Sequence, residues 1–134
     1  MKKGMLLLIA GSAVAAVALI PLVEADQAWA QAQAELRESV ERKFEEYRAA
    51  IRELYRIDIK NFKDKLPGGK ADGKPITKYD LKQLLSGINF ERDHTNDNMA
   101  ALELAMDHLE VMPDYYTRLE RLEWECRSEK LREM

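Results

Sequence analysis

The sequence has 134 residues, a length that suits one small domain together with an N-terminal segment. Its 21 basic and 24 acidic residues give a formal net charge of −3, and this mild acidity argues against nucleic-acid binding, which normally requires a basic surface. The single cysteine, Cys126, excludes an intrachain disulfide and a metal site built from paired cysteines.

Residues 1–25 have the pattern of a membrane anchor or a signal peptide. Lys2 and Lys3 precede a run of 19 uncharged residues, 5–23, and about 20 helical residues are enough to cross a hydrocarbon core. Positive charge before such a run keeps the N-terminus in the cytoplasm. The pattern therefore predicts a single-pass segment, with the rest of the chain outside the cytoplasm.

Two interpretations of this leader stay open. Small residues precede two candidate cleavage points, after Ala25 and after Ala30, and cleavage there would release a secreted protein. The apolar run is longer than the roughly 7–15 residues of a typical signal peptide, which favours a retained anchor. An anchor would place the chain in the bacterial inner membrane, with its C-terminal domain in the periplasm or outside the cell.

Residues 26–64 are expected to form one long amphipathic helix, since 26–62 contain neither proline nor glycine. Apolar residues recur there every three or four positions, which is the spacing of one helix face. This apolar stripe consists of Leu36, Val40, Phe44, Tyr47, Ile51 and Leu54. We expect it to pack against the C-terminal helices of the same chain, with a short coiled coil between two copies as the alternative.

Residues 65–76 are predicted to be a flexible linker, because they contain three glycines and two prolines. A helical domain is expected to follow over 77–134. Thr77 and Asp80 form a variant of the capping box, in which aspartate replaces the usual glutamate. The first helix of this domain should therefore begin at Thr77.

The last helix of the domain should run from about residue 114 to 132. Pro113 suits its first turn, and Leu119, Leu122 and Cys126 are expected to face inward. No segment has the alternating pattern of a strand. The predicted fold class is all-α, with an N-terminal transmembrane or signal helix, a long helix and a small bundle of three shorter helices.

Both histidines lie in one distinctive stretch, 84–123. There an acidic pair ends in His-Thr, the next predicted helix contains Asp-His-Leu, and Pro-Asp-Tyr-Tyr follows. The residues of this pattern are Gly87, Glu91, Asp93, His94, Thr95, Asp107, His108, Leu109, Pro113, Asp114, Tyr115, Tyr116 and Leu119. The stretch resembles a bacterial and phage domain family of unknown function, and the resemblance implies no activity.

The histidines and nearby acids suggest metal binding. Glu91 and His94 are three residues apart, so they share one face of a helical turn. Asp107 and His108 lie on the next predicted helix, which must fold back across a short connection. Imidazole nitrogens and carboxylate oxygens are suitable ligands for zinc or iron. One hypothesis is therefore a divalent metal site formed by these four residues.

The alternative is a structural network without a metal. Buried imidazoles need hydrogen-bond partners for both ring nitrogens, and carboxylates and phenol groups can supply them. Besides the four candidate metal ligands, the members of such a network would be Asp93, Tyr115 and Tyr116. A third interpretation is a response to pH, since histidine titrates near neutrality.

The sequence contains no recognisable nucleophile motif and no phosphate-binding loop, so we expect a protein that is not an enzyme. The preferred interpretation is a membrane-tethered, extracytoplasmic helical module that binds a protein partner or a second copy. A metal-binding helical protein is the first alternative. A further alternative is a structural component of a phage or mobile element that inserts into a membrane.

Overall fold

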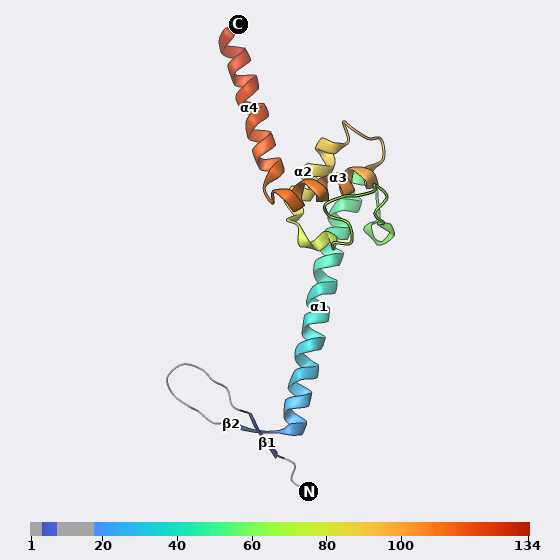
Figure 1. Ribbon diagram of the computed structural model, residues 1–134, viewed down its shortest axis with the longest axis vertical. Coiled ribbons are helices and arrows are strands. Elements are labelled where there is room, and N and C mark those ends of the chain that lie inside the picture. Colours follow the sequence, from blue (N-terminus) through green and yellow to red (C-terminus); the bar gives the residue numbers. More distant parts are fainter. Residues whose placement is uncertain (1–3, 8–17) are drawn as a thin grey trace. The chain divides into compact units, whose positions relative to one another are not determined.

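The body of the chain is helical (Figure 1). The computed structural model describes the backbone of residues 4–7 and 18–134. The four α-helices in these ranges are α1 (Leu22–Tyr55), α2 (Leu81–Glu91), α3 (Asn98–Val111) and α4 (Tyr115–Glu133). Two short 3-10 helices, η1 (Ile59–Asn61) and η2 (Ile76–Lys78), come between α1 and α2 in the sequence. The predicted all-α class is confirmed for this helical body.

The N-terminal segment contains two short strands, β1 (Gly4–Leu7) and β2 (Ala18–Pro21), which pair antiparallel with Gly4 opposite Pro21. The predicted helix is therefore wrong at these positions, because an apolar run without a helical period does not distinguish a helix from a strand. The middle of the predicted leader helix, 8–17, lies outside the described residues. Among the helices that the structure describes, none combines the length and the apolar character needed to cross a bilayer.

The chain divides into two compact units, Met1–Arg42 and Lys43–Met134. The second, which we call the helical unit, contains the end of α1 and all of α2, α3 and α4. This boundary lies inside the predicted long helix. The helical unit therefore includes the predicted linker together with the predicted C-terminal domain.

The last turns of α1 belong to the core of the helical unit. Tyr47 and Ile51 are buried, Phe44 is half-buried, and all three pack with the buried side chains of this unit. The core then continues at Tyr55, four residues after Ile51 and on the same face of α1. This end of the apolar stripe packs within the chain, as the sequence predicts.

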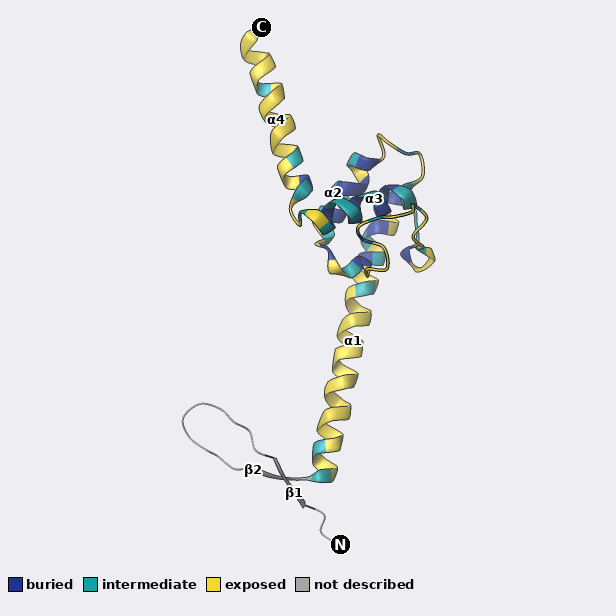
Figure 2. Ribbon diagram, viewed as in Figure 1, coloured by how far each residue is buried: buried dark blue, intermediate teal, exposed yellow. Residues whose placement is uncertain are grey.

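The rest of the apolar stripe is exposed. Every residue from 26 to 43 is exposed, and Figure 2 shows this long exposed part of α1 in yellow. Leu36 is 65% exposed, Val40 is 57% exposed and, nearer the end of α1, Leu54 is 59% exposed. The prediction that the chain's own helices cover the stripe is wrong for these three residues. Tyr55, not Leu54, completes the buried face.

The helix α1 ends at Tyr55, earlier than the predicted end near residue 64. Arg56 has a φ of 58°, a left-handed conformation that stops the helix. Arg48 then donates two parallel bonds of 2.8 Å to the carboxylate of Asp58. These bonds hold the pKa of Asp58 well below its ordinary value, so the pair is ionised at neutral pH and ties the following turn to α1.

The predicted linker, 65–76, is bound to α3 through its backbone N–H groups. Lys65 and Leu66 donate to the carboxylate of Glu103 at 2.8–3.0 Å, and Ala71 donates to Asp107 at 2.8 Å. Ala71 is itself buried. The glycines and prolines of this segment predict a flexible linker. In the structure, two side chains of α3 hold the segment along much of its length.

The helices α2, α3 and α4 form a small bundle. Asp80 accepts a hydrogen bond from the Gln83 N–H and caps α2, which begins at Leu81, later than the predicted start at Thr77. Asp97 caps α3 in the same way. The fully buried side chains of the helical unit include Ile51, Leu84, Ile88, Leu102, Met106 and Tyr116.

Only the beginning of α4 packs into this bundle, through Tyr115, Tyr116 and Leu119. Leu122 is 57% exposed and Cys126 is exposed, so the predicted inward orientation of these two residues is wrong. The reason is length. The helix α4 has 19 residues, whereas α2 has 11 and α3 has 14, so the later turns of α4 lack a facing helix among the described residues.

Candidate functional site

Glu91, the last residue of α2, lies at the centre of a polar network, and its side chain is only 7% exposed. The Tyr116 hydroxyl donates a hydrogen bond of 2.7 Å to Oε1 of Glu91, and Nδ1 of His108 lies 2.9 Å from the same oxygen. Nδ1 of His94 lies 3.6 Å from the other oxygen, Oε2. One buried carboxylate therefore gathers side chains from α3, from α4 and from the turn after α2.

Tyr115 and Tyr116 fix the orientation of His108. The Tyr116 hydroxyl lies 3.1 Å from Nδ1 of His108, and the Tyr115 ring stacks on the imidazole with ring centroids 4.5 Å apart and 5° between the planes. Burial of Tyr116, reinforced by its bond to Glu91, raises the pKa of its phenol far above the ordinary value. The phenol therefore keeps its proton and acts as a donor to Glu91.

Two local features of the sequence allow this convergence. Gly87 lies one turn before Glu91, and a Cβ at this position would lie 2.5 Å from Cε2 of Tyr116 and 2.7 Å from the Cβ of Ala105. Glycine therefore lets the tyrosine ring lie directly against α2. The connection between α3 and α4 has only three residues, 112–114, and it turns α4 back toward His108.

A groove of about 550 Å³ opens beside the network. The side chain of His94 is 73% exposed and that of His108 is 40% exposed, so both imidazoles are accessible from solvent. The groove combines apolar walls with carboxylates and imidazoles. Its lining consists of Phe90, Glu91, Asp93, His94, Leu104, His108, Tyr115, Leu119 and Glu123.

The structure brings together most of the site residues expected from the sequence: Glu91, Asp93, His94, His108, Tyr115 and Tyr116. Asp107 lies elsewhere, because its carboxylate accepts the hydrogen bond from Ala71 in the loop. Successive residues on a helix are about 100° apart around its axis, so Asp107 and His108 face different directions. Of the four predicted metal ligands, the structure therefore brings together three, namely Glu91, His94 and His108.

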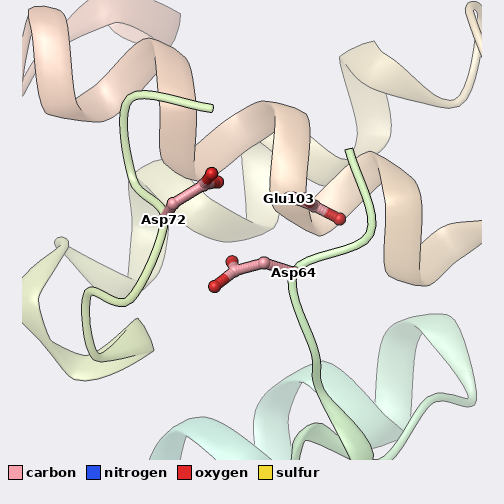
Figure 3. Close-up of side chains that lie close together, drawn as sticks. All are labelled: Asp64, Asp72 and Glu103. Atoms are coloured by element: carbon pink, nitrogen blue, oxygen red, sulfur yellow. The ribbon is translucent and has the colours of Figure 1, made fainter. Parts of the chain in front are cut away.

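A second cluster, not predicted from the sequence, consists of Asp64, Asp72 and Glu103. Within the described part of the chain, it is the one group of three His, Cys, Asp or Glu residues that offer ligand atoms within 4.8 Å of one another. Figure 3 shows Asp64 and Asp72 on the loop segments and Glu103 on the neighbouring helix. A detectable signal was the acidic pair Glu103 and Asp107, four residues apart on one face of α3, in a helix rich in alanine, leucine and methionine.

Two of the three carboxylates in this second cluster already have backbone partners. Glu103, which is 3% exposed, accepts bonds from two loop N–H groups, and Asp64 accepts one from Gly73 at 2.9 Å. Such bonds to backbone donors stabilise a carboxylate without a cation. Glu103 and Asp64 are therefore explained by their role in holding the loop.

Comparisons with known proteins place the site within a family. Neither the curated proteins nor the solved structures contain a match to this chain. A family model, described as a protein of unknown function (DUF5661), matches residues 29–125. The match confirms the resemblance to a family of unknown function and extends well beyond 84–123, to include the exposed part of α1 and the bound loop. The chain therefore belongs to the DUF5661 family.

Proposed function

We propose that the protein is a membrane-tethered interaction module without catalytic activity, and that its helical unit lies outside the cytoplasm. Two lysines followed by 19 uncharged residues support the tether and its orientation. In a bilayer this run would have to form a helix in place of the strands β1 and β2. Because α1 begins at Leu22, at the end of this run, the first described helix would start close to the membrane surface. The interaction would then occur along α1.

The observation that carries this proposal is the exposed apolar surface of α1. Trp29 is 68% exposed, and Leu36 and Val40 are exposed to a similar extent. Gln33 stands between Trp29 and Leu36 on the same face. The series Trp29, Gln33, Leu36 and Val40 then has spacings of four, three and four, which is the pattern of a coiled-coil seam. A single polar residue such as Gln33 within a seam fixes the register of the paired helices at some cost in stability.

The length of the helix also suits a coiled coil. The part of α1 within the first unit, 22–42, corresponds to three heptads, about the length that a sustained coiled coil needs. Asp26 takes the seam position before Trp29, so the stretch with large apolar side chains begins at Trp29 and ends at Val40. The contact is therefore expected to be centred on this stretch.

The occupant of this surface is a second copy of the chain, arranged in parallel. A shared membrane tether gives two copies the same direction and raises their effective concentration. In a parallel pair of this register, Ala32 of one copy faces Arg37 of the other, and Ala25 faces Ala30, so no like charges oppose each other at these flanking positions. The same surface would otherwise leave large apolar side chains in contact with water.

The variant Leu36→Glu with Val40→Glu is expected to abolish this dimer. Each substitution replaces an apolar side chain whose burial contributes about 1.5–3 kcal/mol, so together they should weaken dimerisation by at least about 100-fold. Chemical crosslinking and light scattering of the full chain in detergent would measure the effect. The matched control is Ala34→Glu, which places the same charge on the side of α1 facing away from the seam and should leave the dimer intact. A monomeric wild-type chain would contradict the proposal.

The tether requires a separate experiment in the native host. We expect the chain to remain with the membrane fraction and its intact mass to correspond to residues 1–134. A reporter enzyme that works only outside the cytoplasm should be active when it is fused after Met134. Loss of 25 or 30 residues would indicate secretion after cleavage. A complete chain in the soluble cytosolic fraction would rule out the tether.

A further inference from the structure

We infer that Glu91, His94 and His108 form a binding site for a divalent transition metal, and that zinc matches the donor set best. The site offers one carboxylate oxygen and two imidazole nitrogens, which is a common set of three protein ligands for zinc. All three residues line one groove that is open to solvent. This inference is independent of the proposed tether and dimer.

The distances around Glu91 suit a metal ion. With metal–ligand bonds of about 2.0–2.2 Å in a tetrahedral site, neighbouring ligand atoms lie about 3.4 Å apart. Oε1 of Glu91 and Nδ1 of His108 are 2.9 Å apart, and Oε2 of Glu91 and Nδ1 of His94 are 3.6 Å apart. Each histidine nitrogen is therefore within about 0.5 Å of the separation that zinc requires from one oxygen of Glu91. The oxygen differs between the two histidines, so the His94 imidazole must move toward Oε1 for both histidines to share one carboxylate ligand atom.

One adjustment is needed to close the site. Since the three donor atoms do not all lie within 4.8 Å of one another, one imidazole must turn toward the other. His94 can do so, because its side chain is 73% exposed and lies in the turn after α2. Asp93 or Glu123 from the same groove, or a water molecule, would supply a fourth ligand.

The surroundings of the donors resemble the supporting shell of a metal site. Ligating carboxylates in proteins are usually held by a further hydrogen bond, and the buried Tyr116 hydroxyl provides one to Glu91 at 2.7 Å. The stacked ring of Tyr115 fixes the plane of the His108 imidazole. The alternative cluster of Asp64, Asp72 and Glu103 offers oxygen alone, which suits calcium or magnesium better than zinc.

Zinc titration of the full chain tests the inference directly. The chain, without a polyhistidine tag, would be purified in detergent, stripped with a chelator and titrated with ZnCl₂ by calorimetry, and bound metal would be counted by mass spectrometry. We expect one zinc ion per chain. Titration with Co²⁺ should give a visible absorption spectrum characteristic of nitrogen and oxygen ligands in a low-coordinate site.

Variants locate the ion. His94→Ala should weaken zinc binding by at least about 10-fold, since even residues that only support a metal ligand have effects of this size. The exposed His94 side chain has little packing to lose, and circular dichroism would check the folding of His94→Ala and His108→Ala. The matched control, Asp64→Asn with Asp72→Asn, should bind zinc like the wild type. Absence of stoichiometric zinc, unchanged affinity in the histidine variants, or loss of binding in the control would each overturn the assignment.

Discussion

Replacing Ile51 by alanine is expected to destabilise the protein by about 2–5 kcal/mol, the usual range for removing a large aliphatic side chain from a packed core. Ile51 is 0% exposed and packs in the core of the helical unit together with Tyr47 and Tyr55. It is the most deeply buried residue that α1 contributes to this unit. Its truncation would leave a cavity where the last turns of α1 meet the other buried side chains.

The matched control is Leu54→Ala, three residues further along the same helix. Leu54 belongs to the same apolar stripe but is 59% exposed, so its truncation should change stability by no more than about 0.5 kcal/mol. Urea-induced unfolding of the full chain, followed by circular dichroism, would compare the two variants. Similar losses of stability in both would mean that the division of the stripe into a buried and an exposed part is incorrect.

Gly87→Ala is expected to destabilise the protein even though alanine is the better helix former. Helix propensity alone favours alanine over glycine by about 1 kcal/mol. The new Cβ, however, would lie 2.5 Å from the Tyr116 ring and 2.7 Å from Ala105, and such overpacking costs about 1–3 kcal/mol. Because Ala105 is on a helix and the ring of Tyr116 is fully buried, neither can move aside easily. The expected net loss is therefore up to about 2 kcal/mol.

Asn89→Ala provides the comparison for Gly87→Ala. Asn89 is also in α2 but is exposed, so its replacement should change stability by less than about 0.5 kcal/mol. Thermal unfolding of the two variants would show whether the contact with Tyr116 decides the outcome. A Gly87→Ala variant that is more stable than the wild type would mean that Tyr116 does not pack against α2 as described.

The Glu91 network was predictable because its members are related by short-range geometry. Glu91 and His94 are three residues apart, and the tight connection between α3 and α4 brings Tyr116 back to a histidine only eight residues earlier. Asp107 could not be placed in the same way. A residue beside His108 in the sequence lies about 100° away around the helix, and here that direction faces the loop.

The fate of the apolar stripe could not be read from its periodicity. Leu36 and Tyr47 occupy equivalent positions in the pattern, yet one is 65% exposed and the other 5% exposed. Periodicity shows which face of a helix is apolar, whereas burial depends on what other segments reach that face. The same limit applies to the loop after η1, because its bonds to α3 join residues 36 to 38 positions apart.

The attachment of this loop to α3 makes the order of the loop depend on that helix. The N–H groups of Lys65, Leu66 and Ala71 have their acceptors on Glu103 and Asp107, which share a face only once α3 is helical. The native conformation of the loop therefore depends on a helix that is synthesised after it. Deuterium uptake at these three amides would report the opening of α3 and not the local motion of a surface turn.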